Sequence, residues 1–193
     1  MIKRYTGVSV TVILITICFS INTYAQHSEY GAFIEPSIKF QSVINQTSFI
    51  TGARFGFVIH ERFSVGGGYY ASLNSLSIAP INSQDARLHF NMGGLELESL
   101  LFDIKSFRVS VLFFAGAGAL YKSSASNSDI NYETDNFLVW EPQLLSSTNL
   151  LNWFSINIGL GYRFISYTNP QTTSDAYRLK GLFGVVSLKI HTR

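Results

Sequence analysis

Apolar and polar residues alternate without a break over residues 154–164. One side of this segment carries Phe154, Ile156, Ile158, Leu160, Tyr162 and Phe164; the other carries Ser155, Asn157, Gly159, Gly161 and Arg163. A period of two predicts an extended strand, because a helix would scatter both sets around its circumference. The polar side is small and rich in glycine, whereas the apolar side ends in aromatic residues. This combination is typical of a strand that faces lipid on one side and a polar lumen on the other.

The same alternation recurs along the chain from residue 26 onward. Each repeat is near or above the roughly 9–11 residues that a tilted strand needs to cross a bilayer. The sequence therefore predicts an all-β fold, an eight-stranded antiparallel up-and-down transmembrane β-barrel. We expect its strands near residues 29–41, 48–60, 62–74, 86–101, 107–122, 136–147, 153–167 and 177–191.

The connections between these segments alternate in length. Tight turns are expected at residues 60–62, 103–106 and 148–152, and longer polar connections at 42–47, 75–85, 123–135 and 168–176. Short periplasmic turns and long outer loops are the usual asymmetry of bacterial outer-membrane barrels. This pattern predicts that the longer connections lie outside the cell and that both chain ends lie in the periplasm.

Three strands carry particular expectations about their faces. In the segment 107–122 the valine, phenylalanine and alanine residues at odd positions should face lipid, opposite Gly116 and Gly118. The segment 86–101 changes phase at Gly93-Gly94, which predicts a β-bulge there. The segment 177–191 is the least regular, so its two faces are poorly defined by the sequence.

Residues 1–25 have the features of a secretory signal peptide. Lys3 and Arg4 form a charged start, an apolar core follows over residues 8–21, and Thr23-Tyr24-Ala25 is a small-x-small cleavage site. We therefore expect the mature barrel domain to comprise residues 26–193. Cys18 is the single cysteine and would leave with the signal peptide, so the mature chain is expected to form no disulfide.

Composition supports a membrane environment and argues against several partners. Hydrophobic residues make up 47% of the chain and charged residues only 13%. A soluble barrel of the lipocalin type would usually carry more charge. Of the 14 Lys and Arg residues, Lys3 and Arg4 fall in the signal peptide, which leaves 12 against 12 Asp and Glu. A neutral mature chain gives no electrostatic basis for binding nucleic acid.

Several charged residues fall on the inward side of the predicted strands. An eight-stranded barrel has room inside only for side chains, and buried ions there must be paired. Cross-strand position places Glu35 opposite Arg54 and Glu141 opposite Arg163, so we expect both to be structural ion pairs. The full predicted luminal set is Glu35, Lys39, Arg54, Glu96, Glu98, Glu141 and Arg163.

A catalytic interpretation of these carboxylates is the alternative. Glu96 with Glu98, or Glu35 with Glu141, could act as an acid/base pair. An interior network of ion pairs uses the same residues without any chemistry, and we favour it. The four histidines show no metal-ligand spacing, and the glycine clusters lie inside strands without a following helix. We therefore expect no catalytic residue, no cofactor and no metal ion.

The chain resembles the small eight-stranded outer-membrane β-barrel domain proteins of OmpA/OmpX-like architecture. The resemblance spans nearly the whole mature chain. It implies contact with outer-membrane lipid and with the assembly machinery of that membrane. Such barrels usually end on an aromatic residue, whereas this chain ends Ile190-His191-Thr192-Arg193. The motifs that carry the resemblance are Thr51-Gly52-Ala53-Arg54, Ser64-Val65-Gly66-Gly67-Gly68-Tyr69, Gly93-Gly94-Leu95-Glu96-Leu97-Glu98, Trp140-Glu141-Pro142, Trp153-Phe154 and Gly161-Tyr162-Arg163.

The leading functional hypothesis is a non-enzymatic membrane barrel with a side-chain-filled lumen. Its outer loops would contact a surface ligand or protein partner that their composition does not identify. The alternatives are a small membrane-embedded enzyme acting on lipid or peptide, and a narrow pore for small solutes. An enzyme would place a polar triad at the outer rim, where the predicted loops offer carboxylates but no histidine. Four aromatic residues are expected at the membrane interfaces: Trp140, Trp153, Tyr162 and Phe164.

Overall fold

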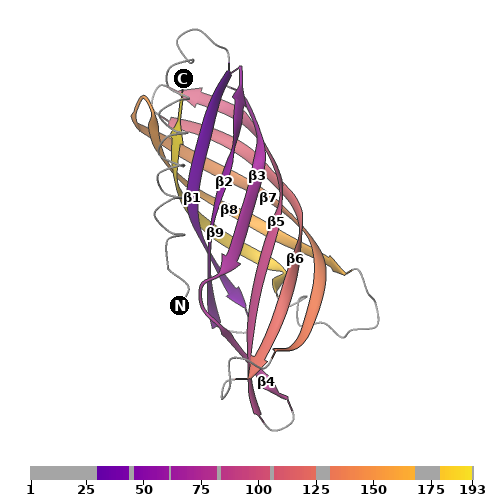
Figure 1. Cartoon of the computed structure of the whole chain (residues 1–193). Helices are drawn as coiled ribbons and strands as arrows, with labels where there is room; N and C mark the ends of the chain where they lie inside the picture. The colour runs from indigo at the N-terminus through magenta and orange to yellow at the C-terminus, as the bar shows by residue number, and fades with distance from the viewer. Residues whose placement is uncertain are drawn as a thin grey trace, which may run out of the picture.

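The chain folds into one closed antiparallel sheet, as the computed structural model shows (Figure 1). The structure describes residues 30–43, 46–60, 62–81, 84–104, 107–124, 131–167 and 179–192. The expected signal peptide lies outside these ranges. The strands are β1 (Tyr30–Val43), β2 (Gln46–Ile59), β3 (Phe63–Ser72), β4 (Leu76–Ile81), β5 (Gln84–Ile104), β6 (Phe107–Ser124), β7 (Asn131–Leu151), β8 (Phe154–Tyr167) and β9 (Gly181–His191).

Eight of the nine strands form the wall of the barrel. Their order is β3-β2-β1-β9-β8-β7-β6-β5, and a further pairing of β3 with β5 closes the ring. Every pairing is antiparallel and joins wall strands that follow one another along the chain, except that β1, the first, pairs with β9, the last. Closure leaves the wall without an exposed strand edge. The predicted eight-stranded up-and-down barrel is confirmed.

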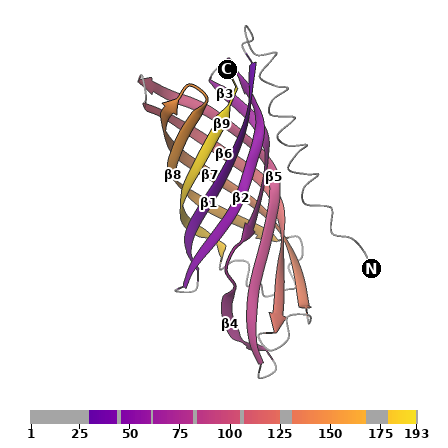
Figure 2. The same cartoon turned by 60° about the vertical axis from the view of Figure 1, so that its left-hand side comes forward.

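The ninth strand corrects the prediction of a loop over residues 75–85. β4 lies there and pairs with the first residues of β5, so the hairpin continues past the wall. β5 and β7 each have 21 residues, about twice what a bilayer crossing requires. β4 and the adjoining parts of β5 and β6 project from the end of the barrel opposite the C-terminus (Figures 1 and 2).

The connection over residues 42–47 is also shorter than predicted. β1 runs to Val43 and β2 begins at Gln46, and these two residues are paired. The predicted connection over 123–135 shortens as well, because β6 ends at Ser124 and β7 begins at Asn131, whereas β8 ends at Tyr167 as predicted and β9 begins only at Gly181. The alternation of short and long connections therefore predicted the ends of the strands less well than the alternation of polar and apolar residues predicted their faces. Polar residues at strand ends had extended the predicted loops.

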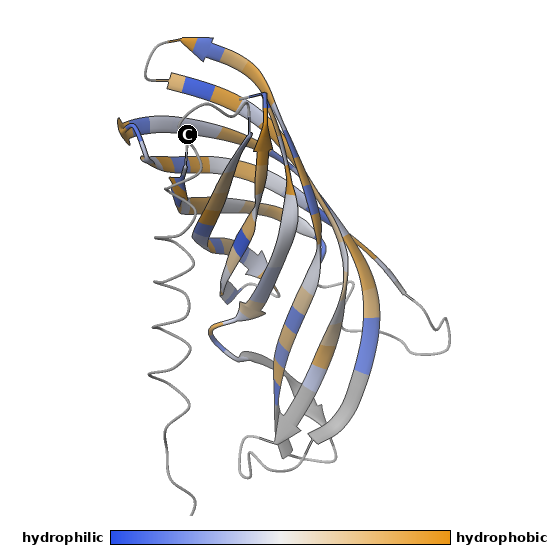
Figure 3. Cartoon of the chain, turned by 45° about the horizontal axis from the view of Figure 1, so that its top comes forward, coloured by the Kyte–Doolittle hydropathy of each residue, from blue (hydrophilic) through white to orange (hydrophobic). Residues whose placement is uncertain are grey.

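Apart from a few local irregularities, side chains alternate between the lumen and the outside of the wall. The outer surface carries large exposed apolar residues on all eight barrel strands, and Figure 3 shows them alternating with polar positions along the ribbons. The lipid-facing set predicted for β8 is on this outside surface, as are Val111 and Phe113 of β6. Among the described residues, no helix is both long and apolar enough to cross a membrane.

The predicted bulge at Gly93-Gly94 is wrong. Pairing of β5 with both β3 and β6 runs through these two glycines without a shift. The irregularity of β5 lies instead between Leu100 and Phe102. The error arose because Phe90 and Met92 are apolar but point inward, where they are buried. They fill the lumen, so the assumption that every apolar residue faces lipid failed there.

Glycines on the inward side let neighbouring strands approach closely. Gly94 and Gly116 are directly paired across β5 and β6. A Cβ atom added at Gly116 would lie 2.3 Å from the Gly93 carbonyl oxygen and 2.9 Å from the Gly94 Cα atom. Because these are backbone atoms, only a shift of the strand could relieve the contact.

Gly116→Ala is therefore expected to destabilise the barrel by about 1–3 kcal/mol, the usual cost of overpacking. Gly67→Ala is the matched control, since its added Cβ would meet nothing closer than 3.5 Å. Equilibrium urea unfolding in lipid vesicles measures both variants. Equal stabilities would show that the close approach of β5 and β6 does not require a glycine.

Candidate functional site in the barrel lumen

The lumen is divided along its length into an apolar and a polar part. Apolar side chains fill the end from which β4 projects; they include Val43, Ile50, Leu88, Phe90, Leu120, Phe137, Val139, Ile165 and Leu179, all buried. The middle and the opposite end are lined by charged and hydroxyl side chains. The polar part is the only described region where ionisable groups gather inside the wall. It is therefore the candidate functional site.

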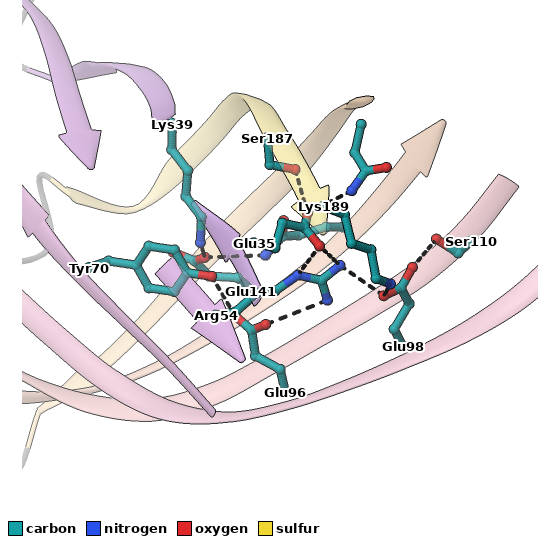
Figure 4. Close-up of polar contacts among 12 residues, drawn as sticks. Glu35, Lys39, Arg54, Tyr70, Glu96, Glu98, Ser110, Glu141, Ser187 and Lys189 are labelled. Carbon is teal, nitrogen blue, oxygen red and sulfur yellow. Dashed lines mark hydrogen bonds and ion pairs between the residues drawn. The ribbon is translucent and has the colours of Figure 1, made fainter. Parts of the chain in front are cut away.

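Arg54 on β2 is the centre of the polar part. β1 and β2 pair with Glu35 directly opposite Arg54, and Arg54 Nη2 lies 2.6 Å from Glu35 Oε2. The same guanidinium reaches across the lumen to β5, where Nη2 is 2.8 Å from Glu98 Oε2 and Nη1 is 3.6 Å from Glu96 Oε2. One buried cation thus serves three carboxylates (Figure 4).

Strands β6, β8 and β9 supply further partners of Glu35 and Glu98. Lys189 Nζ lies 3.0 Å from Glu98 Oε2, and the Ser110 hydroxyl donates to Glu98 Oε1 at 2.8 Å. Asn157 Nδ2 donates to Glu35 Oε1 at 2.7 Å, and the Ser187 hydroxyl donates to the same oxygen. These bonds join the first and last strands of the wall.

A second group surrounds Glu141 on β7. Lys39 Nζ lies 2.6 Å from Glu141 Oε2, and Arg163 Nε lies 2.5 Å from Glu141 Oε1. Gln41 accepts a hydrogen bond from Arg163 Nη1 at 3.0 Å and donates one to the Leu179 carbonyl oxygen. All the charged members of this group are fully buried. The Leu179 contact ties the segment before β9 to the inside of the barrel.

Tyr70 on β3 connects the two groups. Its hydroxyl donates to Glu96 Oε1 at 2.5 Å, and its ring lies 3.6 Å from Lys39 Nζ. A cation over an aromatic face is attracted by the ring quadrupole, most strongly where water is excluded. Tyr70 therefore helps to hold Lys39 between Glu96 and Glu141. Within these two connected groups, four carboxylates, Glu35, Glu96, Glu98 and Glu141, balance four cations, Lys39, Arg54, Arg163 and Lys189.

All seven charged residues predicted for the lumen lie inside the wall. The structure brings Glu35 to Arg54 and Glu141 to Arg163, and adds Lys39 to the second pair. It does not pair any two carboxylates as an isolated acid/base couple, because each contacts a cation or a hydroxyl. Sequence reasoning missed Lys189 and the role of Tyr70. Lys189 sits at an inward position of β9, where the pattern was irregular.

The four predicted interface aromatics lie on the outer surface of the barrel. Trp140, Trp153 and Phe164 are exposed, whereas Tyr162 is half-buried beside Phe164. Trp153 was expected to be the first residue of the strand 153–167, but it lies in the turn between β7 and β8, one residue before β8 begins. Within the described ranges, no three His, Cys, Asp or Glu side chains gather closely enough to hold a metal ion.

A polar cavity opens at the end of the lumen that carries the tight turns. It holds about 100 Å³ and begins beside Glu98, on the far side of the ion pairs from the apolar part. Hydroxyl side chains from four strands line it, namely Ser64, Ser110, Ser147 and Ser155. Its remaining charged lining consists of Arg62, Arg108 and Lys189. The lumen is thus accessible from one end and filled at the other.

No protein-family model and no curated protein matches the chain. Solved structures do resemble it. The N-terminal β-barrel domain of Pseudomonas aeruginosa OprF superposes with a TM-score of 0.55 at 12% identity, covering 83% of this chain and 96% of that one. Neisserial surface protein A gives a TM-score of 0.49 at 15% identity, with 86% and 97% covered. The attachment invasion locus protein Ail of Yersinia pestis gives 0.48 at 11% identity, with 84% and 97% covered.

The likeness to the OprF domain concerns the fold, since so low an identity carries no information on activity. It agrees with what the chain itself shows: a closed antiparallel wall, an apolar outside and a lumen filled with side chains. A surface of that kind suits lipid rather than water. By fold, the chain is an eight-stranded β-barrel of the outer-membrane type.

Proposed function

We propose that the protein is a non-enzymatic integral outer-membrane barrel that acts through the parts projecting on the cell surface. The observation that carries this proposal is the division of the lumen. Ion pairs and apolar side chains occupy it from the level of Glu98 to the end from which β4 projects. Because that part of the lumen is filled, a molecule at the β4 end of the barrel would contact the projecting strands and not the lumen.

The filled lumen argues against the narrow pore. A conducting channel needs a continuous aqueous path, whereas Phe90, Leu120 and Phe137 are each no more than 2% exposed. Eight strands leave an interior that side chains fill. Even if the ion pairs moved, the buried apolar side chains at the β4 end would still block an aqueous path through the lumen.

The carboxylates are also poorly placed for catalysis on a lipid or peptide. Glu35, Glu96 and Glu141 are each at most 1% exposed, and Glu98 is held by Arg54 and Lys189. A general acid or base must come within hydrogen-bond distance of its substrate. These groups instead stabilise the wall. The projecting strands remain as the surface on which a ligand or protein partner would bind.

The proposed location predicts that the mature chain fractionates with the outer membrane. Folded barrels of this kind resist detergent, so unheated and boiled samples should migrate differently in detergent gels. The comparison is made after separating inner and outer membranes and the soluble periplasm. Recovery of the chain in the soluble periplasm without detergent would contradict the proposal.

The proposed orientation is tested separately with epitope tags. A tag inserted at Ser126, between β6 and β7, should be labelled by antibody on intact cells. A tag at Lys105, between β5 and β6, should be labelled only after the outer membrane is permeabilised. Both insertion points lie between the described strands, since β5 ends at Ile104, β6 spans Phe107–Ser124 and β7 begins at Asn131. The opposite labelling pattern would reverse the topology.

A further inference from the structure

We propose that the polar cavity at the turn end of the lumen binds an oxyanion, the phosphate of a free ion or the terminal carboxylate of a peptide. Residues from all eight barrel strands line the cavity, and it opens away from the projecting strands. In the orientation proposed above it faces the periplasm, and that direction alone rests on the proposed function. About 100 Å³ suits one small anionic group or a few water molecules.

Charge in the cavity favours the anion over water. Arg62, Arg108 and Lys189 line it, against the single carboxylate of Glu98. That carboxylate already accepts from Arg54, Lys189 and Ser110, so its charge is neutralised within the wall. Arg62 makes no ion pair with any described residue. Lys189 is paired with Glu98 and Arg108 with Asp103, so among the described residues the charge of Arg62 is the one left in excess at the cavity, beside hydroxyl groups that can donate.

Arg108 offers the most specific feature. Its Nη2 atom is 2.7 Å from Asp103 Oδ2 at the rim, while its Nε atom is buried and has no acceptor among the described residues. A buried donor without a partner costs free energy, which an incoming acceptor recovers. A guanidinium binds carboxylate and phosphate groups through two parallel hydrogen bonds. Asp103 therefore competes with the ligand for Arg108.

The test is calorimetric titration of the purified barrel in zwitterionic detergent at low salt. Inorganic phosphate is one probe; acetyl-alanyl-alanine is another, with its C-terminal amide as the uncharged control. Arg108→Gln should weaken binding roughly tenfold or more, because a charge-assisted bond is lost. Arg87→Gln should leave it unchanged, since Arg87 is an exposed arginine of β5 near the opposite end.

Asp103→Asn separates binding from folding. It removes the competitor of the ligand at Arg108, so affinity should rise, an effect that misfolding cannot imitate. Binding of phosphate alone identifies a free ion, and binding of the peptide acid but not its amide identifies a peptide carboxylate. The proposal is overturned by no binding of either probe at millimolar concentration, by equal loss in Arg87→Gln, or by weaker binding in Asp103→Asn. Since no membrane is involved, these results do not depend on the protein's location.

Discussion

Replacing Arg54 by leucine should cost about 3–5 kcal/mol of unfolding free energy, the penalty for leaving a buried charge without its partner. Arg54 contacts Glu35, Glu96 and Glu98, and of these Glu98 alone keeps another cation, Lys189. The leucine side chain supplies neither charge nor hydrogen bonds. Equilibrium urea unfolding in lipid vesicles gives the difference from the unsubstituted protein.

A double-mutant cycle with Glu35 shows whether the loss comes from the pair. Replacing Glu35 and Arg54 together by leucine removes one of the unpaired carboxylates, so the double variant should lose less than the sum of the single losses. Asp103→Asn is the control, because it breaks the partly exposed ion pair of Asp103 with Arg108 at the rim. It should lower the free energy of unfolding by less than about 1 kcal/mol. Strictly additive losses for Glu35 and Arg54 would mean that the two side chains do not interact.

Replacing Leu160 by arginine should cost about 2–4 kcal/mol, the value for a cation at the bilayer midplane on the lipid face of a barrel. Leu160 lies midway along the outward residues of β8, and 68% of its surface is exposed. If this face were in water, replacing the exposed leucine by arginine would not lower the free energy of unfolding. If it is in lipid, the arginine lowers it, so the sign of the change in unfolding free energy shows which solvent surrounds β8.

Ser166→Arg provides the matched control on the same face of the same strand. Ser166 is exposed near the end of β8, where the polar interface is expected and the penalty for a cation falls to about 0–1 kcal/mol. Both variants are compared by urea unfolding in vesicles of the same lipid. A Leu160→Arg barrel as stable as the Ser166→Arg barrel would place β8 outside the membrane.

The faces of the strands were predictable because lipid and lumen impose different residue types on alternate positions. In β8 this difference is clear, since serine, asparagine and glycine face apolar residues across the strand. The difference in residue type between the two faces disappears where the lumen itself is apolar. Phe90 and Met92 then look like lipid-facing residues, and this produced the bulge wrongly predicted at Gly93-Gly94.

The site was predictable only for neighbouring strands. Glu35 and Arg54 fall opposite each other once the first hairpin is centred correctly, because antiparallel register fixes the position of each residue. The bonds of Arg54 to β5 and of Lys39 to β7 cross the lumen between strands that are not paired. They depend on barrel diameter, strand tilt and side-chain reach. None of these follows from alternation along the sequence.

Luminal bonds between residues far apart in the sequence have a consequence for the rates of folding and unfolding. Glu35 on β1 bonds to Ser187 on β9, 152 residues away, and Glu98 bonds to Lys189, 91 residues away. Such contacts form only after the ring has closed, so they are absent from an open folding transition state. Interactions absent from the transition state slow unfolding and leave the folding rate nearly unchanged. The luminal ion pairs should therefore increase the kinetic stability of the barrel: they lower its unfolding rate and leave its rate of assembly nearly unchanged.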